Sequence, residues 1–179
     1  MEGTIKKLGQ TEIYRGSRVH LVTETIQFPN GKRAEWELIQ HPGAAAVIPV
    51  DADGKIIMVR QYRNATDGWT LEIPAGCLDH PGEDPLECAC RELEEETGHQ
   101  AKKMDFLYKF YSSIGICDEI IHIYVARDLV KTEQSLDEDE FVTVEHHSLD
   151  ALLEMCFQGV IMDNKTISAL LAYRYKYKL

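Results

Sequence analysis

Four glutamates crowd the end of the stretch RELEEETG, at positions 92, 94, 95 and 96. If this stretch is helical, Glu92 and Glu96 lie one turn apart on one face, and like charges in that relation cost roughly 0.2–0.5 kcal/mol. Carboxylates are also disfavoured at the C-terminal end of a helix, where the dipole is already negative. An ordinary solvated face is one explanation. A bound divalent cation is the other, because hard cations such as Mg²⁺ prefer carboxylate oxygens.

A single helix over residues 85–97 would position these glutamates. Asp84 precedes Pro85, and Glu87 follows three residues after Asp84, which predicts a capping box with proline at the first helical position. Gly98 predicts the left-handed residue that ends the helix. The helix therefore spans about three and a half turns at 3.6 residues per turn.

The same helical period separates a core-facing stripe from a charged one. The core stripe is expected to contain Leu86, Ala89, Cys90 and Leu93, which follow the i, i+3, i+4, i+7 spacing. Glu92, Glu95 and Glu96 form the neighbouring stripe. Arg91 lies four residues before Glu95 and can hold a ligand carboxylate in orientation.

The rest of the chain has more strands than helices. Apolar and polar residues alternate in 17–28 and 32–39, and the Pro-Asn-Gly turn between them predicts an antiparallel hairpin. Further strands are expected at 44–50, 55–62, 69–76, 106–113, 120–129 and 141–147, and further helices at 148–159 and 163–178. We therefore expect an α+β fold with a central mixed β-sheet between layers of helices.

Composition excludes several classes of protein. The 179 residues suffice for one globular domain, and the formal net charge of -11 argues against loose, phosphate-driven binding of nucleic acid. Five cysteines without a C-x-x-C pair predict neither a disulfide framework nor a zinc knuckle, which fits a reducing cytoplasm. We find no signal-peptide core and no run near the roughly 20 apolar residues of a membrane span, so no membrane partner is expected.

The stretch from Gly76 to Gly98 resembles the Nudix hydrolase signature, G-x5-E-x7-R-E-U-x-E-E-x-G-U, where U is a bulky aliphatic residue. The matching residues are Gly76, Glu83, Arg91, Glu92, Leu93, Glu95, Glu96 and Gly98. Six residues rather than five separate Gly76 from Glu83, and His99 replaces the last aliphatic residue. The fold that this resemblance implies is a Nudix-type α/β/α sandwich with an N-terminal antiparallel hairpin.

Other motifs resemble the ADP-ribose pyrophosphatase branch of that family. They are LIQHPGAAAV, VRQYR, LEIPAG, SSIGICDE and MDNKTISAL. Ile114 stands where the branch usually has proline, and Trp36 where many members have arginine. The resemblance implies hydrolysis of ADP-ribose to AMP and ribose 5-phosphate. The alternatives are hydrolysis of GDP-mannose or another nucleoside-diphosphate sugar, and a non-catalytic Nudix sensor that binds ADP-ribose without turnover.

The resemblance also implies the catalytic groups. It implies a bound Mg²⁺ ion, with Mn²⁺ as an alternative. The metal ligands that it implies are the Ala75 carbonyl, Glu92, Glu96 and Glu140. It also implies that Glu95 and Arg91 are catalytic residues. Glu138, in the acidic loop 133–140, is implied as the general base. The acidic loop could also be a solvated turn. Glu119 is the rival base or a substrate contact.

The expected substrate contacts are spread along the chain. They are Trp36, Glu37, Arg63, Cys77, Gly115 and Glu119. Arg63 could pair with the diphosphate or be a surface charge. Trp36 could stack on a base or belong to a core or an interface.

The N-terminal hairpin is expected to serve assembly. An isolated two-stranded hairpin is only marginally stable, so it needs a partner. The resembled branch uses such a segment to form a homodimer in which the partner's strands complete the substrate site. We therefore expect residues 1–40 to form a dimerisation segment and residues 41–179 to form the Nudix hydrolase domain.

Overall fold

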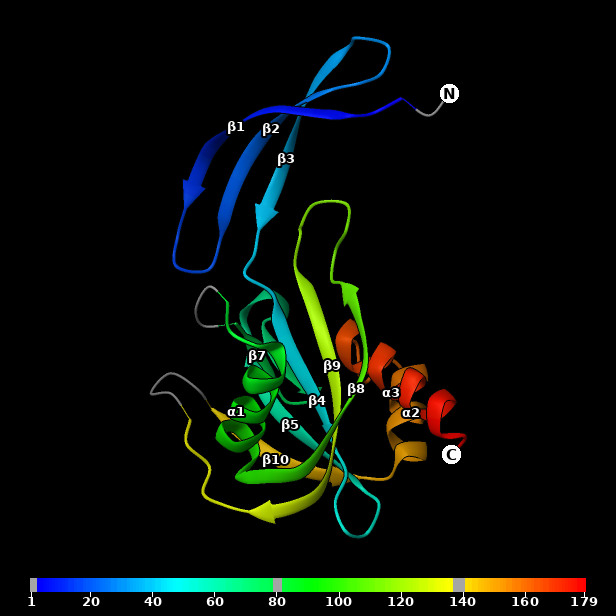
Figure 1. Cartoon of the computed structure of the whole chain (residues 1–179). Coiled ribbons are helices and arrows are strands. Elements are labelled where there is room, and N and C mark those ends of the chain that lie inside the picture. The colour runs from blue at the N-terminus through cyan, green and yellow to red at the C-terminus, as the bar shows by residue number, and fades with distance from the viewer. Residues whose placement is uncertain (1–2, 79–81, 137–140) are drawn as a thin grey trace. The chain divides into compact units, whose positions relative to one another are not determined.

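The computed structural model describes residues 3–78, 82–136 and 141–179, and it divides the chain into two compact units (Figure 1). Unit 1 consists of Met1–Gly43 and Tyr111–Ile120, and unit 2 of Ala44–Phe110 and Ile121–Leu179. The chain passes from one unit to the other three times, at 43–44, 110–111 and 120–121. Each unit has its own secondary structure.

Unit 1 is built on a three-stranded antiparallel sheet in the order β1 (Lys6–Arg15), β2 (His20–Gln27) and β3 (Arg33–Gln40). The predicted hairpin is confirmed as β2 and β3, which pair from Gln27 with Arg33 to His20 with Gln40. Strand β1 was not expected from the sequence. All ten of its residues are exposed, so that it carries no buried face that an alternating pattern could reveal.

In unit 2 the described residues form two sheets. The first has the order β7 (Ala75–Cys77), β4 (Ala44–Pro49), β9 (Ile120–Lys131) and β8 (His99–Tyr111). Its strand β4 runs parallel to β9 and antiparallel to β7, which confirms the mixed sheet. The second sheet has the order β10 (Val142–His147), β5 (Ile56–Arg63) and β6 (Gly68–Glu72), with the short 3₁₀ turn η1 (Asn64–Thr66) between β5 and β6.

Three α-helices cover the first sheet of unit 2: α1 (Pro85–Thr97), α2 (Leu149–Phe157) and α3 (Asn164–Tyr177). Ser148 caps α2 by accepting a hydrogen bond from the Ala151 amide. Asp163 caps α3 by accepting one from the Thr166 amide. In both cases a side-chain oxygen satisfies an N–H that has no partner within the helix.

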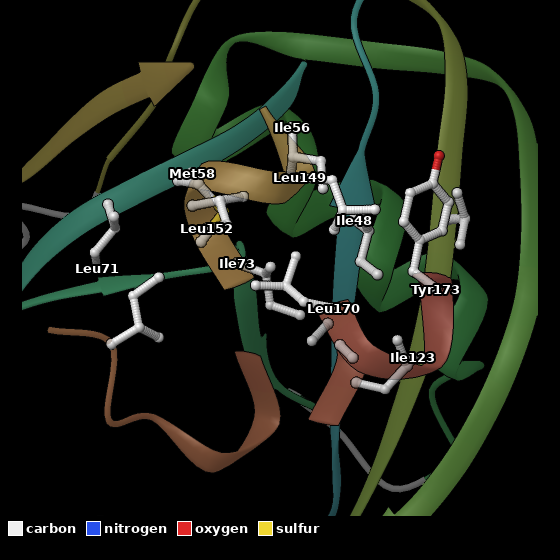
Figure 2. Packing of buried hydrophobic residues seen from close by; sticks show 14 of the residues in the cluster. Ile48, Ile56, Met58, Leu71, Ile73, Ile123, Leu149, Leu152, Leu170 and Tyr173 are labelled. Atoms are coloured by element: carbon white, nitrogen blue, oxygen red, sulfur yellow. The ribbon is translucent and has the colours of Figure 1, made fainter. Parts of the chain in front are cut away.

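Strand β4 explains the layering, because successive side chains of a strand point to opposite faces. Ala46 and Ile48 pack in one cluster with α2 and α3, where Figure 2 shows Leu170 and Tyr173 near Ile48. Val47 packs on the other face in a cluster with residues of α1. The α/β/α sandwich is therefore confirmed, with α1 on one side of the sheet and α2 and α3 on the other (Figure 1).

The core stripe of α1 differs in part from the prediction. Ala89 and Leu93 are fully buried as expected, and so is Cys88. Leu86 is 38% exposed, and Cys90 is also exposed. The buried stripe is thus rotated toward Cys88, because the helix packs along its length against β4 and β7 rather than along the line through Leu86. No helix within the described residues is long and apolar enough to cross a membrane.

Candidate active site

Helix α1 presents the acidic residues from its last turns. Its start is fixed by Asp84, whose Oδ1 accepts a hydrogen bond from the Leu86 amide over 2.8 Å. Its end is fixed by Gly98, which has φ 66° and donates its N–H to the Glu94 carbonyl. Both predicted ends are confirmed. Between them, Glu92 and Glu96 lie one turn apart.

Glu96 is buried, with 3% of its surface exposed. Its Oε2 accepts a hydrogen bond from the Ala75 amide over 3.0 Å, which attaches the acidic turn to the start of β7. The contact brings together Glu96 and the backbone of Ala75, two of the expected metal ligands. A charged carboxylate at this depth is costly unless it is compensated.

Arg91 lies among the other acidic side chains of α1. Its Nη1 donates to Glu92 Oε1 over 2.6 Å and to Glu95 Oε2 over 3.0 Å. Its Nε is 3.5 Å from Glu83 Oε1. Burial lowers the pKa of Arg91, but the Glu92 carboxylate and the hydrogen bonds to it raise the pKa above its ordinary value. Arg91 therefore stays charged and orients the carboxylates around it.

Gly76 allows the backbone of β7 to run over the Glu92 carboxylate. A Cβ at position 76 would lie 1.9 Å from Glu92 Oε1, closer than two such atoms can approach. The adjacent Cys77 carbonyl accepts a hydrogen bond from Arg91 Nη2 over 3.2 Å, so that the Arg91 side chain joins α1 to the backbone of β7. Burial raises the pKa of the nearby Cys88 thiol to about 12, which excludes a thiolate nucleophile there at neutral pH.

The acidic cluster, which we define as Glu83, Glu92 and Glu95 around Arg91 together with Glu96 one turn after Glu92, carries four negative charges and one positive charge. Its formal net charge is therefore −3. Within residues 3–78, 82–136 and 141–179, no three acidic, histidine or cysteine side chains converge closely enough to coordinate an ion. The donor chemistry nevertheless fits a divalent cation, because hard carboxylate oxygens in excess of the local positive charge are what Mg²⁺ and Mn²⁺ bind.

The segment that follows β9 is attached to the acidic turn of α1. The Gln134 side chain donates to the Glu96 carbonyl over 2.6 Å, and the Ser135 amide donates to the Glu95 carbonyl over 3.0 Å. Gln134 was missed by the sequence reasoning, since a lone glutamine in a polar loop gives no signal. Glu138 and Glu140, expected as base and metal ligand, lie outside the described residues.

Arg63 belongs to a second ion-pair cluster of unit 2, at the ends of β5 and β6. Its guanidinium makes two hydrogen bonds to Glu72, from Nε over 2.8 Å and from Nη2 over 2.7 Å. Glu72 is only 2% exposed, and Lys165 also donates to it. The Glu72 hydrogen bond raises the pKa of Arg63, and the Glu96 charge acts on it in the same direction. Arg63 is thus within electrostatic reach of the acidic cluster.

Three of the expected substrate residues line one cavity in unit 1. Trp36, Glu37 and Gly115 surround a space of about 780 Å³ whose other walls are largely apolar, and Ile114 is among them. Trp36 is 52% exposed and packs edge-on against Phe28, with ring centroids 5.7 Å apart. An exposed indole in an apolar recess can stack on a flat ring.

Glu119, the rival base, is adjacent to His41 in unit 1. Its Oε1 is 3.4 Å from His41 Nδ1, and the neighbouring Asp118 accepts a hydrogen bond from the His41 amide over 2.8 Å. Glu119 does not line the cavity around Trp36. The structure therefore sets His41 beside one of the candidate residues.

Several known proteins are similar in sequence to this chain. A methanol dehydrogenase activator from Bacillus methanolicus is 44% identical over 92% of this chain and 89% of its own length. An ADP-ribose pyrophosphatase from Bacillus subtilis is 42% identical over 92% of this chain and 90% of its own. More distant relatives include a GDP-mannose pyrophosphatase from Yersinia enterocolitica, at 34% identity over 72% of this chain and 71% of its own.

A solved structure and a family model also match this chain. The crystal structure of an ADP compounds hydrolase superimposes with a TM-score of 0.86 and 25% identity, over 98% of this chain and 95% of the other. Nudix hydrolases generally depend on divalent metal ions. The match to the family described as NUDIX domain extends over residues 40–169, which include the whole acidic cluster. With its relatives and its fold in agreement, the chain belongs to the NUDIX domain family and is a Nudix pyrophosphohydrolase.

Proposed function

We propose that the protein hydrolyses the pyrophosphate bond of ADP-ribose to give AMP and ribose 5-phosphate. The observation that carries the proposal is the acidic cluster of α1, with Gly76 directly over Glu92, in a chain of the NUDIX family. Relatives with the name ADP-ribose pyrophosphatase support the substrate. A diphosphate is rich in negative oxygens, so a site for its hydrolysis needs cations and a base.

The metal ligands in this proposal are Glu92, Glu96, the Ala75 carbonyl and Glu140. The ion is Mg²⁺, with Mn²⁺ as the alternative. When bound, it supplies neutralisation of phosphate oxygens and makes a water molecule easier to deprotonate. The contact between the Ala75 amide and Glu96 supports a shared site, since it sets the β7 backbone beside that carboxylate.

The chain's own residues bind the diphosphate, orient the carboxylates and accept the proton of the attacking water. Water adds to one phosphorus atom, the bond from that phosphorus to the bridging oxygen breaks, and the bridging oxygen leaves on the other phosphate. Glu138 takes the proton of the attacking water. Arg91 keeps Glu92 and Glu95 in orientation, and Arg63 pairs with the diphosphate. Substitution of Glu138 by Gln should lower kcat with little change in KM, whereas Glu119→Gln should mainly raise KM.

In the proposed homodimer, the cavity of unit 1 contributes to the nucleotide pocket of the other subunit and binds the nucleoside end of its substrate. Trp36 stacks on the base, and the Glu37 carboxylate accepts a hydrogen bond from an exocyclic amino group. The exposure of Trp36 and the apolar walls of the cavity support this role. Gly115, Glu119 and Cys77 remain proposed substrate contacts.

The runner-up substrate is GDP-mannose or another nucleoside-diphosphate sugar, because some relatives are named GDP-mannose pyrophosphatase. A sensor that binds ADP-ribose without turnover is the non-enzymatic alternative. Purified protein with Mg²⁺ should be assayed against ADP-ribose, GDP-mannose, NADH and diadenosine polyphosphates. Release of AMP from ADP-ribose at the highest kcat/KM supports the proposal, and binding without any release supports the sensor.

A second candidate role follows from the relative named methanol dehydrogenase activator. We propose testing it by adding the protein to a methanol dehydrogenase and measuring the rate of methanol oxidation. The Glu96→Gln variant separates the two roles. If the wild-type protein activates and the variant does not, activation requires the acidic cluster.

We further propose that residues 1–40 form a homodimer of Nudix domains 41–179 in the cytoplasm. In the described part of unit 1, β1 is exposed along its whole length and carries apolar side chains such as Ile13 and Tyr14, which are 55% and 59% exposed. Such an edge strand is available for pairing with a second chain. Sedimentation velocity at micromolar concentration measures the assembly, and a fully active monomer would contradict it.

A further inference from the structure

The buried carboxylate of Glu72 joins two segments that are far apart in the sequence. From the hairpin of β5 and β6, Arg63 makes two hydrogen bonds to it, and Thr70 donates to its Oε1 over 2.6 Å. From the start of α3, Lys165 donates to its Oε2. Every oxygen lone-pair direction of Glu72 can thus be used by a donor, which is why a carboxylate that is 2% exposed can remain charged.

The start of α3 is held against the end of β6 by further hydrogen bonds. Thr166 is fully buried, and its Oγ1 accepts from the Ile73 amide over 3.0 Å while donating to Asp163 over 2.6 Å. Asp163 also accepts from Lys165 over 3.0 Å. The motif DNKT, which the sequence reasoning quoted without assigning it a role, therefore forms one rigid connection from helix cap to strand.

Arg63 is left with one free edge by this arrangement. Its Nε and Nη2 are used by Glu72, and its Nη1 has no hydrogen-bond partner among residues 3–78, 82–136 and 141–179. Its side chain is 39% exposed and lines a cavity of about 270 Å³ together with Thr66, Thr70 and Lys165. A guanidinium whose other edge is fixed can present its free N–H groups to a phosphate in a single orientation.

The charges of the cluster explain why a lysine is needed. Glu72 and Asp163 are balanced by Arg63 and Lys165, two negative charges against two positive ones. Without Lys165 the same groups would carry a net negative charge, and Arg63 would be drawn toward two carboxylates instead of one. A net negative charge beside Arg63 would also repel an anionic ligand.

We propose that Lys165 is a positioning residue for the substrate diphosphate: by sharing the Glu72 carboxylate with Arg63, it fixes the Arg63 guanidinium with its free edge available to a phosphate. The inference rests on the proposed function, since it assigns Arg63 to the diphosphate. Lys165 acts through Arg63 and does not itself contact the substrate.

A double-mutant cycle tests this role. Lys165→Met should raise KM for ADP-ribose about tenfold while kcat stays within about twofold, because ground-state and transition-state binding through Arg63 are lost together. The Kd for ADP-ribose, measured by calorimetry in EDTA, should rise by a similar factor. In an Arg63→Met background, Lys165→Met should have no further effect on either quantity. Lys165→Arg should restore KM, because a guanidinium can also donate to Glu72.

Lys176→Met is the matched control, because it removes a lysine of the same helix whose side chain, within the described part of the chain, donates a hydrogen bond to the Phe106 carbonyl and to no carboxylate. It should leave KM unchanged. If Lys165→Met does not fold, Lys165→Gln, which keeps a donor and loses the charge, takes its place in the cycle.

The outcomes separate this inference from the proposed function. Wild-type protein that turns over none of the nucleoside-diphosphate sugars overturns the proposed function, and the inference with it. Turnover by the wild type with additive losses in the double variant overturns the inference alone, and shows that Lys165 acts independently of Arg63. A lowered melting temperature in Lys165→Met with unchanged KM and Kd also overturns it, because that is the result of a purely structural ion pair.

Discussion

Two clusters of charged residues in unit 2 differ in their balance of positive and negative charge. The acidic cluster around Arg91 has a net charge of −3, whereas the cluster around Glu72 contains as many cations as carboxylates. Three of the four carboxylates of the first, Glu92, Glu95 and Glu96, lie in the C-terminal half of α1, where the helix dipole adds to the repulsion. The second lies at the N-terminal end of α3, where donors from β5, β6 and α3 hydrogen-bond its buried Glu72 carboxylate. We infer that the first cluster is made for an external cation and the second for holding side chains in place.

The pKa of Glu72 shows how complete the compensation is in the second cluster. Burial by itself would raise the pKa, but the hydrogen bonds from Arg63 and the charge of Lys165 outweigh it and lower the pKa from 4.5 to about 2. A buried carboxylate with that pKa is stabilised by its partners more than it is destabilised by loss of water. Removal of a charge should therefore have different consequences in the two clusters.

The largest effect is expected for catalysis in the acidic cluster. Glu96→Gln and Glu92→Gln should each lower kcat for ADP-ribose by roughly 10²- to 10³-fold, because a ligand for the cation is lost. The free energy of unfolding without metal should change by less than about 0.5 kcal/mol, and in the stabilising direction, because repulsion is relieved. Glu94→Gln on the same helix is the control, since Glu94 bonds only to Gln100 among the described residues. Unchanged turnover in either variant at saturating Mg²⁺ would end the assignment of these ligands.

The next effect is on stability in the Glu72 cluster. Glu72→Gln should lower the free energy of unfolding by about 3 kcal/mol, because two cations remain without the buried carboxylate that they share. Glu145→Gln is the control, since Glu145 pairs with Arg60 but its side chain is 30% exposed. This substitution should lower the free energy of unfolding by less than about 1 kcal/mol. Urea denaturation of the three proteins gives the comparison. Equal losses in both variants would mean that burial of the pair is unimportant.

The acid dependence of stability should follow Glu72. Because its folded pKa is lowered from 4.5 to about 2, its contribution is fully present above the unfolded value and is lost as the pH falls through the folded value. The difference in unfolding free energy between wild type and Glu72→Gln should thus shrink by about 3 kcal/mol between pH 5 and pH 2. Denaturation at several pH values measures it, and a constant difference over this range would contradict the shift.

The smallest effect is expected on kcat, from a substitution at Gly76, where the β7 backbone lies against Glu92. Gly76→Ala places a Cβ where Glu92 lies, so that Glu92 must move, and kcat should fall about tenfold. Gly9→Ala, in a position with no heavy atom within 4 Å of the new Cβ, is the control and should retain activity. Wild-type kcat in Gly76→Ala would show that the position of Glu92 is not critical.

Much of the fold could be predicted from local pattern. The ends of α1 were predictable because Asp84, Pro85 and Gly98 act through their own backbone geometry, which needs no distant partner. The β2–β3 hairpin and the buried strand β4 were visible as alternation and as an apolar run. Strand β1 was not, because it is exposed on both faces and is defined only by backbone pairing with β2.

The candidate site likewise has features that local spacing predicts and features that depend on tertiary packing. Spacing alone places Glu92 and Glu96 one turn apart, and the family resemblance follows from that spacing. The bond from the Ala75 amide to Glu96 and the close approach of Gly76 to Glu92 depend on β7 packing against α1, which no local pattern specifies. The register of the helix is a local property, and the position of a neighbouring strand is a long-range one.

The sequence by itself determined the acidic face of α1, the family and the proposed reaction, because these depend on residue types at fixed intervals along one helix. Only the tertiary structure decided that Glu72 is buried between Arg63 and Lys165, residues 102 positions apart in the chain. The Glu72 ion pairs form because folding removes that carboxylate from water and surrounds it with the Thr70 hydroxyl and the two cations that the β5–β6 hairpin and α3 bring to it.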